Sequence, residues 1–114
     1  MTKEEIELTS FQIIAHAGDA LDCFQKAIDS AKENNFELSD DYMRKGKKFM
    51  TEAHKIQTKL LTLEANDEDI KFSVILLHSQ DHLMSTLNYE RMANEFISLY
   101  RRINSLEKQG GQNE

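Results

Sequence analysis

The sequence predicts an all-α protein folded as an antiparallel up-down-up bundle of three helices. Its 114 residues suffice for one domain with a modest core. The chain has no proline, only four glycines and 30% charged residues, a composition that favours helices over sheets. Apolar residues recur every three or four positions along three long segments, and short polar breaks separate these segments.

The first two helices are predicted at residues of about 4–33 and 39–65. The break between them begins at Asn34, and Ser39 is the expected N-cap of the second helix. The second helix has the clearest pattern in the chain, with small or apolar residues in alternating steps of four and three. These residues are Tyr42, Gly46, Phe49, Ala53, Ile56, Leu60 and Leu63.

The third helix is predicted at residues of about 67–103, with acidic residues from Asp67 onward near its positive end. Its segment FSVILL, at 72–77, is apolar almost all the way round, although a helix in a three-helix bundle normally keeps one face in water. A second copy of the chain is the simplest cover for that face, so the sequence predicts an oligomer. The single domain is expected to span residues 1–103, and residues 104–114 to form a flexible tail.

The charge and composition argue against several classes of protein. A net charge of −6 and a pI of about 5.2 argue against a nucleic acid or an anionic membrane as a partner. No segment resembles a signal peptide or a membrane span, and the single cysteine, Cys23, can form no internal disulfide. We therefore expect a cytoplasmic protein in which Cys23 is a small buried apolar residue.

The segment LLHSQDHLMST, at 76–86, places several reactive side chains in one stretch of the third helix. His78 and His82 are one turn apart and share a side of the helix. Asp81 belongs to the adjacent apolar stripe, and Gln80 points roughly opposite His78. Gln80 therefore cannot support the histidine of its own helix, but it can reach a histidine of a neighbouring subunit.

Asp81 has two interpretations. Aspartate is mostly exposed in proteins, so Asp81 can lie at the solvated edge of its stripe. Alternatively, the stripe faces a cyclic symmetry axis, where identical carboxylates repel each other unless a divalent cation binds between them.

The two histidines allow three interpretations. Their spacing suits a pair of zinc ligands, although Ser79 stands where an HExxH motif has its glutamate. They can instead line an oligomer interface without any chemical role. Thirdly, a neutral imidazole can accept a phosphoryl group and pass it on. No Lys or Arg occurs between Phe72 and Glu90, and such weak clamping of a phosphate suits a carrier that must release it.

The segment HSQDHLMS resembles the active-site segment, typically HAQDHLMT, of the lactose/cellobiose-type enzyme IIA of the bacterial phosphoenolpyruvate-dependent sugar phosphotransferase system. Two further segments are similar to this family in order and spacing: IIAHAGDA at 13–20, and EAHKIQTKLLTLEA at 52–65 with the family's AH..QT pattern. The resemblance covers residues of about 4–103. Leu21 stands where the family usually has arginine. If that arginine orders the site, this chain is expected to differ in its rate of phosphoryl transfer or in its choice of partner.

The resemblance implies a three-helix bundle assembled as a homotrimer and a phosphoryl group carried on His78. It implies His82 as a supporting histidine, Gln80 as a supporting residue across the subunit interface, and Asp81 as the residue that gathers around a magnesium-like metal at the trimer axis. The phosphoryl donor would be the histidine-containing phosphocarrier protein, and the acceptor a cysteine of the cognate enzyme IIB. A β-linked disaccharide of the lactose, cellobiose or chitobiose type would then be phosphorylated during uptake through the membrane sugar permease component.

Overall fold

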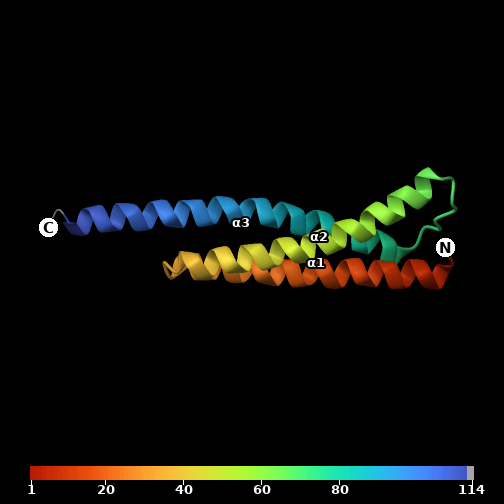
Figure 1. Ribbon diagram of the computed structural model, residues 1–114, viewed down its shortest axis with the longest axis horizontal. Coiled ribbons are helices and arrows are strands. Elements are labelled where there is room, and N and C mark those ends of the chain that lie inside the picture. Colours follow the sequence, from red (N-terminus) through yellow and green to blue (C-terminus); the bar gives the residue numbers. More distant parts are fainter. Residues whose placement is uncertain (113–114) are drawn as a thin grey trace.

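A computed structural model describes residues 1–112 of the chain. It contains three helices, α1 (Lys3–Lys32), α2 (Phe36–Ala65) and α3 (Val74–Gln112), and no strand among the described residues. The helices run up, down and up in an elongated body of 68 × 20 × 19 Å, and α3 extends beyond the turn that joins the other two (Figure 1). The all-α, up-down-up fold predicted from the sequence is confirmed.

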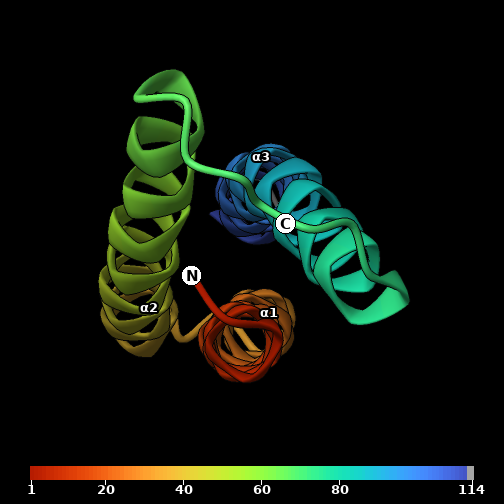
Figure 2. The ribbon, with the colours of Figure 1, turned by 90° about the vertical axis from the view of Figure 1, so that its right-hand side faces the viewer.

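The core lies along α1, which packs against both of the other helices, whereas α2 and α3 make few contacts with each other. In Figure 2 the end of α2 points to the top of the view, whereas the start of α3 points to the lower right, so the two ends diverge. The fully or almost fully buried apolar residues are Ile6, Ile13, Ala17, Ala20, Phe24, Ala27, Ile28 and Ala31 of α1, Met43, Met50, Ala53 and Leu60 of α2, and Leu83, Ala93 and Ile97 of α3. The outer sides of α3 are therefore left without cover from the same chain.

Gly46 allows α1 and α2 to approach each other closely. It is buried in the middle of α2, and a Cβ atom added there would overlap the ring of Phe24 on α1. That ring is itself completely buried, so it has little room to move aside. The glycine in the four-three pattern of the second helix is thus a packing requirement.

The turn between α1 and α2 corrects one prediction. Asn34 adopts a left-handed backbone with φ 61°, and the side chain of Asn35, not of Ser39, accepts the capping hydrogen bond from the Leu38 N–H over 3.2 Å. Ser39 was the wrong choice because its side chain is fully buried against α1, where its hydroxyl donates to the Ala27 carbonyl over 2.8 Å. The helix consequently begins three residues earlier than predicted.

The start of α3 lies later than the predicted residue 67. Asp67 has a left-handed backbone with φ 61°, and residues 66–73 form a connecting loop. Glu68 binds the amino terminus of Met1 over 2.6 Å, so this acidic residue holds the loop and does not lie in the first turn of a helix. The hydroxyl of Ser73 accepts a hydrogen bond from the Leu76 N–H over 3.1 Å and caps α3.

The predicted tail is helical as far as the structure describes it, because α3 continues through residues 104–112. Backbone hydrogen bonds extend an existing helix locally, and each glycine weakens it by only about 1 kcal/mol, so two glycines do not stop it. Arg101 anchors α3 to α2 just before α3 extends beyond the other helices. It binds Asp40 over 2.9 and 3.0 Å and lies 4.7 Å from the centre of the Phe36 ring. Residues 113 and 114, also assigned to the tail, lie outside the described residues.

Cys23 is buried, as predicted, and the free thiol packs as a small apolar side chain. Burial raises the pKa of the Cys23 thiol, which disfavours the reactive thiolate. Among the residues that the structure describes, no helix is long and apolar enough to cross a membrane.

The Gly46→Ala substitution should lower the free energy of unfolding by about 2 kcal/mol, because the added methyl group must displace a buried ring. Urea unfolding followed by circular dichroism, at one fixed protein concentration, measures the change. Gly18→Ala is the matched control, since nothing lies within 4 Å of a Cβ at that exposed helical position. It should be neutral or stabilising by up to about 1 kcal/mol; equal losses in both variants would contradict the close helix approach.

Candidate functional site

The side chains of His78 and His82 contact each other on a partly exposed side of α3. Their Nε2 atoms are 3.1 Å apart, and their ring centres are 4.5 Å apart with an interplanar angle of 88°. His78 is exposed and His82 is half-buried. A hydrogen bond between two Nε2 atoms requires one ring to donate and the other to accept, so the two neutral rings must hold different tautomers.

Neighbouring residues fix this part of α3 on α1. Thr86 is buried and its hydroxyl donates to the Ala17 carbonyl over 3.4 Å, and the hydroxyl of Tyr89 donates to the Gln25 side chain. Burial raises the pKa of the Tyr89 hydroxyl, with Asp29 adding to the effect, so Tyr89 stays a neutral donor. The histidine pair therefore lies on a helix segment whose rotation is restrained from α1.

Asp81 lies on a continuous exposed stripe along α3. The large apolar residues of this stripe expose between 43% and 78% of their surface. They are Val74, Leu77, Met84, Met92, Phe96, Leu99, Ile103 and Leu106. The Asp81 carboxylate is exposed, lines a shallow hollow with Val74, Leu77 and His78, and forms no ion pair within the part of the chain that is described.

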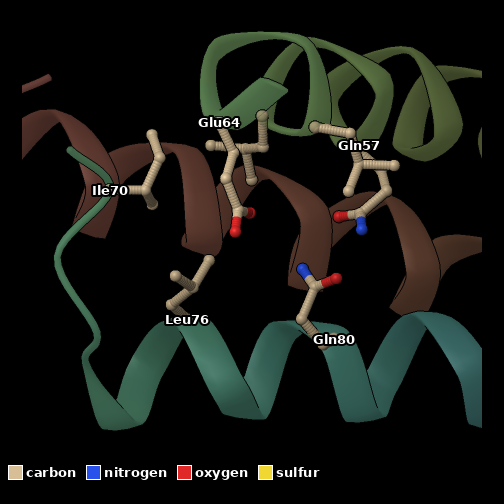
Figure 3. Close-up of a pocket in the computed structure, with 7 residues that line it drawn as sticks. Gln57, Glu64, Ile70, Leu76 and Gln80 are labelled. Atoms are coloured by element: carbon tan, nitrogen blue, oxygen red, sulfur yellow. The ribbon is translucent and has the colours of Figure 1, made fainter. Parts of the chain in front are cut away.

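Gln80 faces away from the histidines and lines a cavity of about 150 Å³ between α2 and α3. Leu76 and Ile70 line the same cavity, and Gln57 and Glu64 enter it from α2 (Figure 3). The half-buried Gln80 donates from Nε2 to the hydroxyl of Ser79 over 3.3 Å. The cavity opens where α2 and α3 diverge.

The structure brings together only part of the predicted site within one chain. His78 and His82 meet, and Asp81 lies beside His78 in the same hollow. Gln80 lies on the other side of the helix, as the periodicity predicted. Among the described residues, no cluster of three or more His, Cys, Asp or Glu side chains is arranged to hold a metal ion, so within one chain the histidine pair has no third zinc ligand.

Gln57, the glutamine of the AH..QT pattern, is a candidate that was not predicted as a site residue. Its Oε1 atom is buried without a hydrogen-bond partner. The signal in the sequence was its position, four residues after Ala53 and three before Leu60, both of which are buried. A polar side chain at a core-facing step of a helix is costly unless it has a partner.

The model of the family described as "PTS system, Lactose/Cellobiose specific IIA subunit" matches residues 8–101. The lactose-specific EIIA component of Staphylococcus epidermidis is 37% identical over 102 residues, which cover 90% of this chain and 98% of that protein. The lactose-specific EIIA component of Streptococcus mutans is also 37% identical, with the same coverage of both chains.

Solved structures are similar to this chain as well. The crystal structure of the PTS cellobiose-specific enzyme IIA from Bacillus anthracis superimposes with a TM-score of 0.87 at 37% identity, covering 92% of this chain and 94% of that one. The IIA(Chitobiose) chain in a solution structure of its complex with HPr, from Escherichia coli, gives a TM-score of 0.76 at 28% identity. That match covers 87% of this chain and 96% of the other.

The contact between the histidines predicts opposite tautomers for the two rings at a pH where both are neutral. Long-range ¹H–¹⁵N correlation spectra of histidine-labelled protein should show one of the two rings protonated on Nε2 and the other on Nδ1. His82→Ala should remove this difference from the His78 signals, whereas His54→Ala, at an exposed position of α2, should leave them unchanged. Two rings protonated only on Nε2 would contradict the hydrogen bond.

Proposed function

Because the chain belongs to the lactose/cellobiose-specific IIA family of the sugar phosphotransferase system, we propose that it is a phosphocarrier that accepts a phosphoryl group on Nε2 of His78. The observation that carries the proposal is the 3.1 Å contact between the Nε2 atoms of His78 and His82. If His82 carries its proton on Nε2, His78 carries its own on Nδ1, and its Nε2 holds a lone pair on an exposed ring.

The transfer needs no cation from this chain. The Nε2 lone pair of His78 forms a bond to phosphorus while the bond from phosphorus to the donor nitrogen breaks, and its electron pair stays on the donor ring. The donor ring takes up a proton from solvent, and His78 releases its Nδ1 proton. The Nε2–H of His82 turns from the His78 nitrogen to a phosphoryl oxygen as the new bond forms. It stabilises the phosphorylated ring by a single hydrogen bond, which leaves the group easy to transfer.

The donor in this proposal is the phosphohistidine of the histidine-containing phosphocarrier protein. The complex of the chitobiose relative with HPr supports this choice. In the second step a cysteine thiolate of the cognate enzyme IIB attacks phosphorus, the bond to His78 breaks, and the ring regains its Nδ1 proton. The sugar is a β-linked disaccharide of the lactose, cellobiose or chitobiose type, taken up through the membrane sugar permease component while this carrier stays in the cytoplasm.

The exposed stripe of α3 supports a homotrimer in which three copies of this helix surround an axis. An apolar stripe of this length on a water-facing side is typical of an oligomer interface. At about 100° per residue, His78 lies about 60° to one side of Asp81 and Gln80 about 100° to the other. If Asp81 faces a threefold axis, Gln80 of one subunit therefore lies next to His78 of its neighbour. In one chain His78 and Gln80 lie on different faces of α3. In the trimer, His78 of one subunit and Gln80 of its neighbour together form the site.

A divalent cation at the axis fits Asp81. The carboxylate is exposed in an apolar stripe and forms no ion pair within the described chain, so three copies brought together would repel each other. Oxygen ligands suit a hard cation such as Mg²⁺. When bound, the ion would offset two of the three negative charges, while the chemistry of phosphoryl transfer stays with the histidines.

Incubation of the protein with phosphoenolpyruvate, enzyme I and the histidine-containing phosphocarrier protein should yield one acid-labile phosphate per chain. His78→Ala should take up none, because it lacks the nucleophile, whereas the surface variant His54→Ala should match the wild type. Phosphate measurement after acid and alkaline treatment provides the test.

Two other functions predict different results. A purely structural oligomerisation module would take up no phosphate in the wild type, and His78→Ala would alter only its assembly. A zinc protein would bind stoichiometric zinc that the double substitution of His78 and His82 removes. Equal phosphate uptake by the wild type and His78→Ala would refute the proposed carrier.

Asp81→Leu should retain or strengthen the trimer and abolish its metal binding, since it replaces repelling carboxylates by apolar packing. Sedimentation equilibrium with and without a chelator measures assembly, and elemental analysis measures the metal. Asp22→Leu, on the exposed side of α1, is the control and should change neither. A monomeric wild type would contradict both the trimer and the axial metal.

A further inference from the structure

We infer that Gln57 is a positioning residue that holds the amide of Gln80, so that Gln80 directs an N–H toward the phosphorylated histidine of the neighbouring subunit. This inference rests on the proposed function, because it gives Gln57 a role within the site that the trimer completes. Gln57 itself would not contact the phosphoryl group.

The first observation is an unsatisfied carbonyl oxygen. Gln57 Oε1 is buried from solvent and has no hydrogen-bond partner. Every other buried side-chain nitrogen or oxygen among the described residues has a partner. Leaving such an oxygen unpaired costs on the order of 1–3 kcal/mol. A methionine could fill the same space without that cost. The presence of an amide at position 57 therefore indicates that a hydrogen-bond donor approaches Gln57 Oε1 in some state of the protein.

The second observation is the position of an available donor. Figure 3 shows the amide ends of Gln57 and Gln80 directed toward each other across the cavity between α2 and α3. The hydrogen bond from Gln80 Nε2 to the hydroxyl of Ser79 is long, at 3.3 Å, and is the one side-chain hydrogen bond of this amide in the described part of the chain. That hydroxyl already donates to the Leu76 carbonyl over 2.6 Å. Gln80 can therefore give up this weak bond at little cost.

The cavity has room for the two amides to meet. Its volume of about 150 Å³ is well above the ~10–15 Å³ that one water molecule needs. A rotation of either side chain, or one bridging water, joins Gln80 Nε2–H to Gln57 Oε1. Leu60, Leu61 and Ile70 also line the cavity, and such apolar surroundings strengthen a hydrogen bond between neutral groups.

Glu64 is the other acceptor in the cavity. Its residue is exposed, so water already satisfies its oxygens. Gln57 is neutral and its carbonyl oxygen is buried. We therefore assign the acceptor role to Gln57.

The orientation of the Gln80 amide explains why a second glutamine matters. An amide presents N–H donors at one end and a carbonyl acceptor at the other, and only the donor end attracts a phosphoryl oxygen. When Oε1 of Gln57 accepts one Nε2–H, the other Nε2–H remains for the neighbouring subunit. Without Gln57, the amide can rotate and present its carbonyl oxygen instead.

The test compares rates of phosphoryl transfer from the phosphorylated phosphocarrier protein to His78 in rapid-quench experiments. Gln57→Met keeps the volume but removes the acceptor, and should slow transfer by about five- to tenfold. The double variant Gln57→Met/Gln80→Met should be no slower than Gln80→Met alone, because Gln57 acts through Gln80. Gln57→Glu keeps an acceptor and should recover the rate to within about twofold of the wild type.

Two controls separate positioning from general effects on the cavity. Leu61→Met changes the shape of the same cavity, and Glu64→Gln changes its charge; both should transfer at the wild-type rate. NMR of the wild type gives an independent measurement. Exchange of the Gln80 side-chain amide protons should be slower than that of the exposed Gln12, and Gln57→Met should remove this protection.

A wild-type rate in Gln57→Met, or losses that add in the double variant, would overturn the inference. If Gln57→Met fails to fold or assemble, the wild-type NMR decides, since exchange of the Gln80 amide as fast as that of Gln12 also overturns it. Phosphate uptake by His78→Ala would instead refute the proposed function itself. Normal phosphorylation of His78 together with an unaffected Gln57→Met would refute the role of Gln57 alone.

Discussion

The packing of α1 against both other helices is the constraint on which the arrangement of the molecule depends. Phe24 of α1 lies against Gly46 of α2, and hydrogen bonds from Thr86 and Tyr89 connect α3 to α1. Since α2 and α3 make few contacts with each other, only one side of α3 is covered. Its remaining surface offers separate places for a histidine pair, an apolar stripe and a cavity, and these are the parts from which the proposed trimeric site is built.

Neutral groups dominate the surroundings of the histidine pair. The α3 segment that carries it has no lysine or arginine, and His82 offers a hydrogen bond without a full positive charge when neutral. A strong cationic clamp would stabilise a bound phosphate and slow its departure. For a carrier that both accepts and donates the same group, moderate stabilisation keeps the two transfers nearly balanced. The amide of Gln80 is the same kind of neutral donor.

The periodicity of the sequence was sufficient for the helical fold, the stripe containing Asp81 and the opposite placement of Gln80, because these follow from about 100° of rotation per residue. The roles of the site residues came from the resemblance to a family and not from spacing. Helix ends were less predictable. Ser39 has an N-cap side chain yet packs against α1, and the left-handed backbones at Asn34 and Asp67 depend on how the chain turns. Gln57 was overlooked because only the assembled helices show that its oxygen lacks a partner.

The loop at residues 66–73 reaches the cavity through Ile70, which lines it beside Leu76. Loops accept substitutions and changes of length more readily than packed helices do. Variation in this loop can therefore reshape the surroundings of the two glutamines while the stripe of α3 keeps its sequence. If Gln57 positions Gln80 as proposed, variation in this loop can change the rate of phosphoryl transfer while the surface through which the copies assemble stays the same.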